Sequence, residues 1–559
     1  MPTLRTLPEL FRDRVAATPG SEAYRQFDRA ADGWHVVDWA DMGRRVARWT
    51  RALGAELLPP GARAAILARG SIEHVCMDQA VLALGLVPVP LHAIDNPESI
   101  AYILADSGAR ILLVETEARW TQLARLRERF PDLGKVLCLE RPEGGDAIWT
   151  EDWLAQADKA GAAEPAQAGT APDALAAIVY TSGTTGRPKG VMLTHGNVVS
   201  NVEALLQIVD VRPNDQFLSF LPLSHTFERT VGYYTPIAAG ACVAYARSVQ
   251  ELPQDLRQVR PTILVSVPRI YERIYAKLQE SRLARLRWPL LDLLVGRQLR
   301  AQFGGRLRFA ITGGAPMALA VAERFGELGV EVLQGYGMTE SSPVVAANRP
   351  GANDPASVGA PIPGVEVKIG ANDELLVKGP NVMAGYLNRP EDTAKAIAEG
   401  WLHTGDQAEI RDGRIVIKGR IKDIIVTSTG EKIAPADLEL ALQDDPLFAQ
   451  AILIGENRPF LAVLAVLEFH HWKSEAAALG LNPHEHNSLD TPAARQMVLG
   501  RIRKALASFP SYATPRAAWL TLEPWTVDNG LITPTLKLKR PAIEQRFAAQ
   551  IRQLYGAHG

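Results

Sequence analysis

Short apolar runs alternate with amphipathic stretches along most of the chain. The runs ARAAILA (62–68) and ARILLVE (109–115) have the length and composition of interior strands, and the stretch SIEHVCMDQAVLALG (71–85) between them has a helical period. A shorter amphipathic helix is predicted over residues 7–17. Strands that alternate with helices in this way predict an α/β fold, in which parallel or mixed sheets carry helices on both faces.

The same pattern divides the chain. Residues 155–173 are rich in Ala, Gly and Pro and are predicted to form a surface loop, which leads into the apolar run ALAAIVY (174–180), a predicted buried strand. Further on, polar turn residues cluster around Gly419. We therefore expect a large N-terminal domain (1–418) and a small C-terminal domain (419–559) of a size that can fold alone.

Composition and charge narrow the classes of partner. The 559 residues are 47% hydrophobic and 22% charged, with a formal net charge of -2. This is typical of a soluble globular protein and argues against nucleic acid as a partner. An anionic ligand must then be held by local groups.

The cysteines and the apolar runs bear on location. Cys76, Cys138 and Cys242 are far apart and form no CxxC pair, so we expect neither a disulfide framework nor a structural zinc site. A reducing cytoplasm fits such cysteines. The N-terminal stretch lacks the apolar core of a signal peptide, and no uncharged apolar run has the length of a membrane-spanning helix.

A loop that follows the run at 174–180 is the first candidate site. The segment YTSGTTGRPKG (180–190) places glycines, hydroxyl side chains and a lysine directly after a strand. Glycines let the backbone approach a ligand, and backbone N–H groups in such a loop suit phosphate oxygens. The residues concerned are Thr181, Ser182, Gly183, Thr184, Thr185, Gly186, Lys189 and Gly190. A flexible polar turn is the alternative. The segment is not a Walker A loop, because Arg187 and Pro188 separate the last loop glycine from the lysine.

A second segment supplies a carboxylate and an aromatic ring. In QGYGMTESSP (334–343), which TGGAP (312–316) precedes, Glu340 is a candidate Mg²⁺ ligand beside phosphates. Tyr336 offers a flat face for an adenine ring. The alternative for Thr339 and Glu340 is a pair that caps the start of a helix.

Three further segments carry candidate polar groups. In GWLHTGDQAEI (400–410), Asp406 follows a tight turn, and one carboxylate can accept both hydroxyls of a ribose diol. The alternative is an aspartate that satisfies its own turn. The segments IKGRIKDIIVTSTGEKIAPADLE (417–439) and NGLITPTLKLKR (529–540), the second with Lys537 in a basic run, would each alone be typical of a solvated surface.

Together, the five segments resemble the core motifs of the adenylate-forming (AMP-binding) superfamily, which includes acyl-CoA synthetases, luciferases and the adenylation domains of peptide synthetases. The resemblance extends from Leu7 to Arg540. The segments LPLSHTFERTVG (221–232), VPRIYERIY (267–275) and TPTLKLKR (533–540) resemble the long-chain fatty acyl-CoA synthetase branch. The last departs from the PKTxxGK form common elsewhere, and aligning it on the general SGKIxR form favours Lys537 over Lys539 as the catalytic lysine.

The resemblance implies a two-step ligase reaction. A fatty carboxylate attacks the α-phosphorus of ATP to give acyl-AMP and pyrophosphate, and coenzyme A then takes the acyl group and releases AMP. The first step brings an anion to an anion, so that fixed cationic groups and Mg²⁺ lower the barrier. ATP, Mg²⁺ and coenzyme A are the implied cofactors and co-substrates.

The resemblance also implies roles for individual residues. Lys537 contacts the carboxylate and the α-phosphate, Glu340 holds Mg²⁺ with Thr181 or Thr184 nearby, and Asp406 and Arg420 bind the ribose hydroxyls. The loop 181–186 and Lys189 bind the β- and γ-phosphates. The adenine is framed by Gly313, Gly314, Ala315 and Tyr336. Further cofactor-binding residues are Gly335, Gly337 and Thr339.

Movement of the small α+β domain follows from the same resemblance. Lys537 must withdraw before a thiol can enter, and the hinge maps to Lys422. The loop VTSTGEKI (426–433) then faces the active site. His225 is implied to line the acyl pocket near the carboxylate and counts with the catalytic residues Lys537, Glu340 and Thr181. A buried histidine that the backbone satisfies is the alternative.

Several alternatives stay open at this point. Another acid:CoA ligase, or an acyl-AMP ligase that loads a carrier protein, shares these motifs. A catalytically silent lipid or nucleotide sensor is disfavoured because the charged motif residues are all present. The arginine- and leucine-rich segment 281–300 fits either peripheral contact with the inner membrane surface or a helix that covers the core.

Overall fold

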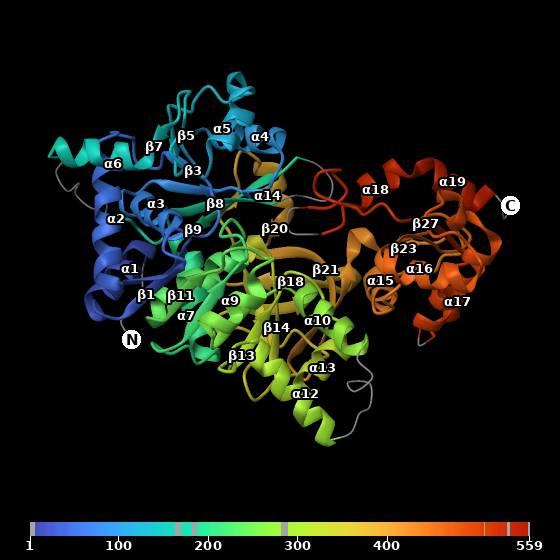
Figure 1. The fold of residues 1–559 in the computed structure, drawn as a ribbon. Coiled ribbons are helices and arrows are strands. Elements are labelled where there is room, and N and C mark those ends of the chain that lie inside the picture. The colour runs from blue at the N-terminus through green and yellow to red at the C-terminus, as the bar shows by residue number, and fades with distance from the viewer. Residues whose placement is uncertain are drawn as a thin grey trace.

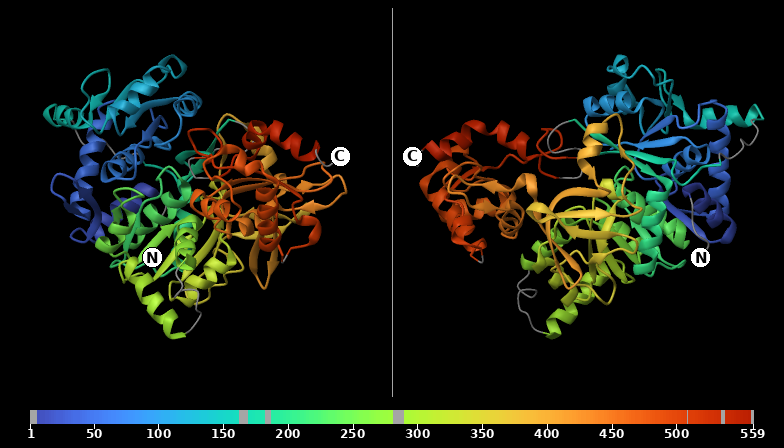
Figure 2. Two further views of the ribbon diagram at one scale, coloured as in Figure 1. Left: turned by 45° about the vertical axis from the view of Figure 1, so that its right-hand side comes forward. Right: turned by 180° about the vertical axis from the view of Figure 1, so that it is seen from behind.

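The chain folds into a large N-terminal domain and a smaller C-terminal domain, which lies to one side and is coloured orange to red in Figures 1 and 2. The structure is a computed structural model that describes residues 6–161, 169–181, 187–280, 289–507, 509–533 and 537–556. The predicted mixed α/β fold with a large and a small domain is confirmed. The boundary at residues 418 and 419 stays a prediction, and Gly419 itself lies within strand β22, one residue before that strand ends.

One sheet of the large domain is parallel throughout, with strand order β4-β3-β5-β6-β7. Alternate residues of β3 enter different apolar clusters. Ile66 packs in the cluster that contains Val75 of α3, and Leu67 packs in the cluster that contains Leu104 of α4. The sheet is therefore covered by helices on both faces, as the sequence predicts. Its elements are β3 (Arg63–Leu67), β4 (Val87–Pro90), β5 (Ala109–Val114), β6 (Lys135–Cys138), β7 (Ile148–Trp149), α2 (Trp39–Gly54), α3 (Ile72–Ala83), α4 (Pro97–Ser107) and α5 (Glu117–Ala124).

The largest sheet has strand order β16-β15-β14-β13-β12-β10-β11-β1-β2 among the described residues. Its central strands β11 to β14 are parallel and end toward the candidate site segments. Its strands are β1 (Glu22–Asp28), β2 (Gly33–Asp38), β10 (Gln216–Ser219), β11 (Cys242–Tyr245), β12 (Ile263–Ser266), β13 (Phe309–Thr312), β14 (Val332–Gly337), β15 (Val344–Ala347) and β16 (Ala360–Pro361). The helices packed with it are α1 (Leu7–Ala17), α7 (His195–Ile208), α8 (Thr235–Ala239), α9 (Leu252–Val259), α10 (Pro268–Glu280), α12 (Pro289–Gln302) and α13 (Leu319–Glu327), together with the π-helical segment η2 (Glu228–Tyr234).

Two smaller antiparallel sheets complete the large domain. The first pairs β8 (Leu175–Thr181), β9 (Lys189–Thr194) and β19 (Gly385–Tyr386). The second contains β17 (Glu366–Ile369), β18 (Glu374–Lys378), β20 (Ile397–Ala398), β21 (Trp401–Arg411) and β22 (Arg414–Arg420). The helix α14 (Pro390–Ala396) follows β19, and the short 3-10 turn η3 (Thr339–Ser341) lies between β14 and β15.

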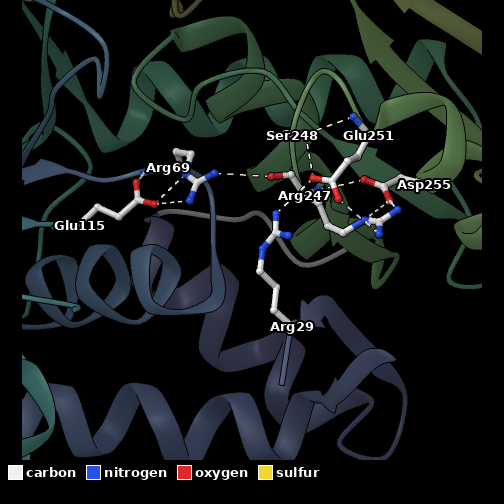
Figure 3. Close-up of polar contacts among 7 residues, drawn as sticks. All are labelled: Arg29, Arg69, Glu115, Arg247, Ser248, Glu251 and Asp255. Carbon is white, nitrogen blue, oxygen red and sulfur yellow. Dashed lines mark hydrogen bonds and ion pairs between the residues drawn. The ribbon is translucent and has the colours of Figure 1, made fainter. Parts of the chain in front are cut away.

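An ionic cluster joins the two large sheets (Figure 3). Arg69, just after β3, donates from Nε to Glu115 Oε1 at 2.7 Å and from Nη1 to the carbonyl oxygen of Arg247 at 3.5 Å. Arg247, just after β11, donates in turn to Asp255 Oδ1 at 2.7 Å. The remaining members of the cluster are Arg29, Ser248 and Glu251. These contacts fix the carboxyl ends of the two sheets relative to each other.

The small domain is built on the sheet β25-β26-β27, covered on both faces. Leu442 and Trp472 belong to one apolar cluster, whereas Ile543 and Ile551 belong to the other. Its elements are β23 (Ile425–Val426), β24 (Lys432–Ile433), α15 (Pro435–Gln443), β25 (Phe448–Ile454), β26 (Ala462–Leu467), α16 (Phe469–Ala478), α17 (Pro492–Ala505), β27 (Ala517–Thr521), α18 (Arg540–Arg546) and α19 (Ala548–Gly556).

One sequence expectation meets a different outcome, and a second is described only in part. The predicted loop 155–173 is wrong over its first residues, because α6 (Thr150–Lys159) continues to Lys159, with Trp153 and Leu154 buried on its inner face. In the segment 281–300, residues 281–288 lie outside the described residues. The remainder lies in α12, which buries Leu299, while its Leu293 side is exposed. Within the described residues, no helix has the length and apolar character needed to cross a membrane.

Candidate active site

The hairpin of β8 and β9 carries the first candidate segment. Thr181 ends β8, Lys189 begins β9, and the two residues pair across the ladder. Lys189 Nζ lies 2.9 Å from Asp392 Oδ2 and 5.1 Å from the ring centre of Tyr386. This lysine lowers the pKa of the Asp392 carboxyl by hydrogen bonding. The loop residues Ser182, Gly183, Thr184, Thr185 and Gly186 lie outside the described residues.

Glu340 is buried in η3, and its carboxylate lies beside the same tyrosine that Lys189 contacts. Its Oε1 accepts a hydrogen bond from the Tyr386 hydroxyl at 2.8 Å, so the Tyr386 side chain contacts both Glu340 and Lys189. Thr339 is the first residue of η3 rather than its cap, which rules out the helix-capping alternative. Its hydroxyl lies 3.3 Å from that of Thr226. Segments far apart in sequence therefore meet at Glu340.

Asp406, Tyr336 and Arg420 form one hydrogen-bonded group. The Tyr336 hydroxyl donates to Asp406 Oδ2 at 2.6 Å, and Arg420 Nε lies 3.1 Å from Asp406 Oδ1. Burial raises the pKa of the Asp406 carboxyl, and Arg420 opposes that shift. Asp406 lies inside β21, not after a tight turn as the sequence suggests. The residues before and after it alternate between buried and half-buried, and Gly405 with φ +70° distorts the strand at this point.

The glycine-rich segments leave adjacent parallel strands at the same end. β13 and β14 pair from Ala310 to Thr312, and the candidate residues Gly313, Gly314 and Ala315 follow β13, while Gly335 and Gly337 end β14. The carboxyl ends of neighbouring parallel strands are the usual place for a ligand in an open α/β sheet. The candidate adenine frame is thus assembled at one edge of the sheet.

Lys537 of the small domain faces this edge. Its backbone N–H donates to Thr533 Oγ1 at 3.0 Å, which fixes the turn that carries it. The side chain retains accessible surface, yet the protein around it lowers the pKa of the ammonium group, as does Arg420. Asp406 and Glu340 act in the opposite direction. Lys537 is therefore within electrostatic range of the main polar groups of the large domain.

His225 follows β10 and is half-buried. Its Nδ1 accepts a hydrogen bond from the backbone N–H of Phe227 at 3.3 Å, so the backbone does satisfy one of its nitrogens. Burial lowers its pKa to about 3, and the charges of Lys537 and His92 lower it further in the same direction. The hydroxyl of Ser224 lies 2.9 Å from Nδ1 of His92.

Sequence reasoning missed four residues at this site: His92, Ser224, Tyr386 and Asp392. The run VPVP at 87–90 ends directly before Leu91 and His92, so a polar residue at the carboxyl end of a buried strand was the signal for His92. No motif marks Tyr386 or Asp392.

The predicted hinge Lys422 lies in the 3-10 turn η5 (Ile421–Asp423), directly after Arg420 and β22. The loop 426–433 runs from β23 to β24, where Thr427 N donates to Glu431 O at 3.0 Å. This geometry does not test whether Lys422 is a hinge or whether the loop 426–433 turns toward the active site. Both roles stay predictions.

Comparisons with known proteins assign the chain to a family. The AMP-binding enzyme family matches residues 11–387, and the AMP-binding enzyme C-terminal domain family matches residues 422–559. The long-chain-fatty-acid–CoA ligase FadD15 of Mycobacterium bovis is 30% identical, over 95% of this chain and 94% of the relative. The peroxisomal long chain acyl-CoA synthetase 7 of Arabidopsis thaliana is 31% identical, over 86% of this chain and 76% of the relative.

The fold agrees with solved structures. The A domain of carboxylic acid reductase from Segniliparus rugosus, solved with AMP and a co-purified carboxylic acid, superposes with a TM-score of 0.82 at 22% identity, over 99% of this chain and 94% of that domain. With both family matches and relatives that span nearly its full length, this chain belongs to the AMP-binding enzyme family.

Proposed function

We propose that this protein is a long-chain fatty acid:CoA ligase that releases AMP and pyrophosphate. Curated relatives that span most of the chain carry the names of such ligases. The observation that carries the proposal is the approach of Lys537, from the small domain, to Asp406, Arg420 and Glu340 of the large domain. A cation delivered to a nucleotide-sized polar site is what adenylate formation requires.

ATP would bind along the edge formed by β13, β14 and the β8–β9 hairpin. Asp406 and Arg420 would bind the ribose hydroxyls, with the carboxylate oriented by Tyr336. Lys189 and the loop 181–186 would bind the β- and γ-phosphates. The adenine would lie among Gly313, Gly314, Ala315 and Tyr336, with Gly335, Gly337 and Thr339 as further residues that bind the nucleotide.

The residues present fit a magnesium ion at Glu340. Mg²⁺ in phosphate sites is held by one or two carboxylates together with phosphate oxygens, not by a cage of protein ligands. Glu340 supplies one such carboxylate, and it contacts the Tyr386 side chain that also contacts Lys189, where the phosphates would bind. Glu340 would hold the ion with Thr181 or Thr184. The ion would neutralise phosphate charge.

In the first step, an oxygen of the fatty carboxylate attacks the α-phosphorus, and the bond to the bridging oxygen of pyrophosphate breaks. Lys537 would offset the negative charge of both reactants. Its lowered pKa reflects burial and Arg420, and ATP phosphates would favour the charged form. His225 would line the acyl pocket beside the carboxylate.

In the second step, the thiol of coenzyme A attacks the acyl carbonyl carbon, and AMP leaves. The small domain, taken as residues 419–559, would rotate about Lys422 so that Lys537 withdraws and the loop 426–433 faces the site. We place the protein in the cytoplasm, with peripheral contact of segment 281–300 at the inner membrane surface. A liposome flotation assay without enrichment of the protein contradicts that contact.

A panel of acids from short to very long chain tests the substrate class. Purified protein is incubated with ATP, Mg²⁺ and each acid, and pyrophosphate and AMP are measured with and without coenzyme A. We expect pyrophosphate release with long-chain acids and acyl-CoA only when coenzyme A is present. Absence of pyrophosphate release with every acid contradicts the proposal, and a maximum at short or aromatic acids contradicts its substrate class.

Lys537→Ala tests the mechanism, with Lys539→Ala as the matched control. Loss of the ammonium group should slow adenylation by about 10²–10³-fold, as removal of a preorganised charge-stabilising group does. Conversion of preformed acyl-AMP and coenzyme A to acyl-CoA should stay close to the wild-type rate. Equal loss of both half-reactions, or the same split in Lys539→Ala, counts against Lys537.

A further inference from the structure

His92 is a polar side chain at the site that the adenylation chemistry leaves unused. It follows β4 at the carboxyl end of the parallel sheet, whereas Ser224 and His225 follow β10 of the largest sheet. The contact of 2.9 Å between His92 Nδ1 and Ser224 Oγ joins these two sheet edges. Nδ1 is thereby engaged by Ser224, and Nε2 has no hydrogen-bond partner among the described residues. The side chain is half-buried and keeps accessible surface.

His92 lies near the polar groups of the candidate site, and its burial favours the uncharged form. His92 is within electrostatic range of His225, which is itself within range of Lys537. Burial lowers the pKa of His92, and the carboxylate of Asp95 opposes this shift. Arg119 binds the backbone oxygen of Asp95 through Nη2 and adds a cation on that side. Neutral imidazole is therefore the dominant form at neutral pH.

The two half-reactions differ in whether they need a proton acceptor, a role that a neutral imidazole can fill. Adenylation joins a carboxylate and a phosphate that are already ionised, so it needs cations and no proton acceptor. Thioester formation starts from a thiol, whose ordinary pKa of about 8.5 leaves it protonated at neutral pH. His225 is a poor acceptor, because its Nδ1 already accepts a hydrogen bond from the backbone N–H of Phe227 and burial lowers its pKa. In the proposed function, the nucleotide and its magnesium ion are bound by Glu340, Asp406 and Arg420.

We propose that His92 is the general base of the thioester half-reaction and accepts the proton of the attacking thiol at Nε2. The step uses the tautomer in which Nδ1–H donates to Ser224 Oγ across the 2.9 Å contact, which leaves the lone pair on Nε2. As the sulfur–carbon bond forms, the S–H proton moves to Nε2. The bond between the acyl carbon and the phosphate oxygen then breaks, AMP leaves as the anion, and the imidazolium releases its proton to solvent. This inference rests on the proposed function.

His92→Gln tests the inference, with the exposed histidine of β2 as the matched control, His35→Gln. Glutamine keeps a hydrogen bond to Ser224 but cannot take up a proton. We expect adenylation, measured as pyrophosphate release, to change by less than about threefold. Single-turnover conversion of acyl-AMP and coenzyme A should fall by about 10²-fold, the usual contribution of a general base. His35→Gln should leave both rates unchanged.

The pH dependence of the thioester step provides a readout that a structural role would not change. The wild-type rate should rise as His92 loses its proton, with an inflection below the ordinary imidazole value of 6.5, and then level off. In His92→Gln the rate should keep rising toward the thiol pKa of about 8.5, so that the difference narrows at alkaline pH. External imidazole should partly restore the rate of His92→Ala.

Three outcomes overturn the inference. They are a His92→Gln variant with a normal thioester step, an equal loss of both half-reactions in a variant that melts like wild type, and a wild-type profile without the imidazole inflection. The last is measured on the unmodified protein, so it decides the question even if the variants fail to fold. Failure of the wild type to release pyrophosphate contradicts the proposed function instead.

Discussion

Glu228 shows how far the interior changes the chemistry of a single residue. The side chain is fully buried at the start of η2, Oε1 accepts a hydrogen bond from Ser219 Oγ at 2.6 Å, and Oε2 has no partner in the described part of the chain. Burial raises its pKa to about 8, well above the ordinary 4.5. The folded protein therefore holds a proton on Glu228 over a range of pH in which the unfolded chain does not.

Glu228→Gln should remove a pH dependence of stability. Because the pKa of Glu228 is raised in the folded state, its contribution is complete below pH 4.5 and is lost as pH rises toward about 8. Urea unfolding of wild type and variant at several pH values in this window measures the difference. The free energy of unfolding of the wild type should fall relative to the variant as pH rises.

Glu391→Gln is the matched control, because the Glu391 side chain is exposed and water solvates its carboxylate. It should follow the wild-type curve throughout. A Glu228→Gln curve that stays parallel to wild type across the window would falsify the raised pKa.

At the scale of residues, the sequence predicts the site best where a motif exists. Tyr336, Asp406 and Arg420 come from three segments and meet through hydrogen bonds and an ion pair, as their motif membership suggests. His92 and Asp392 could not be assigned in this way. Their neighbours at the site come from other sheets or helices, and a hydrophobic pattern along the chain does not specify which strand ends face each other.

At the scale of elements, the turn from β14 into β15 leaves no room for a side chain at Gly337. A Cβ atom on Gly337 would lie 2.0 Å from the carbonyl oxygen of Pro343, which is backbone and cannot move aside. Met338 N donates to that same oxygen at 3.0 Å, so the close approach is part of the pairing between the strands. The position of Glu340, between the two strands, depends on it.

Gly337→Ala should disrupt this turn and destabilise the large domain. A substitution whose new methyl group clashes with fixed backbone should lower the free energy of unfolding by roughly 3 kcal/mol or more. Thermal unfolding and soluble yield measure the effect, and adenylation should be lost with them. The control Gly326→Ala lies in α13 with no atom within 4 Å of its Cβ, and should be neutral or more stable by about 0.5–1 kcal/mol. Equal melting temperatures for the two variants would argue against the steric account.

The periodic pattern predicts most regular elements that it was applied to. The strands at 63–67, 109–114 and 175–181 and the helices at 7–17 and 72–83 lie where the apolar periods place them. The pattern fails at 155–159, where alanine-rich composition suggested a loop. Alanine is also the strongest helix former, and buried Trp153 and Leu154 hold that helix to the core.

For the molecule as a whole, the contact between the two domains determines whether Lys537 faces the large domain, as adenylation requires in the proposed function. Leu440 of α15 packs against the large-domain cluster that contains Tyr271 of α10. This contact belongs to the arrangement in which Lys537 faces the large domain. The sequence predicts two domains and a mobile lysine, but it carries no pattern that specifies how one domain seats on the other.

Leu440→Ala should weaken that arrangement selectively. Loss of part of a half-buried leucine removes about 1–2 kcal/mol of apolar burial. Adenylation should slow several-fold, while thioester formation from preformed acyl-AMP should be unchanged or faster. Leu57→Ala, at an exposed position in the large domain, is the control. Equal slowing of the two half-reactions by Leu440→Ala would contradict a role in domain placement.

The same contact brings two carboxyl side chains, one from each domain, near each other. Glu272 of α10 has a raised pKa, mainly from burial. Arg269 opposes this shift, and Asp444, directly after α15, adds to it. The pKa of Asp444 is raised by burial as well. To the extent that these shifts depend on the seated arrangement, seating the small domain should take up protons and lifting it away should release them. A weakly acidic medium should then favour the seated form, through carboxyl groups remote from the bonds being made and broken.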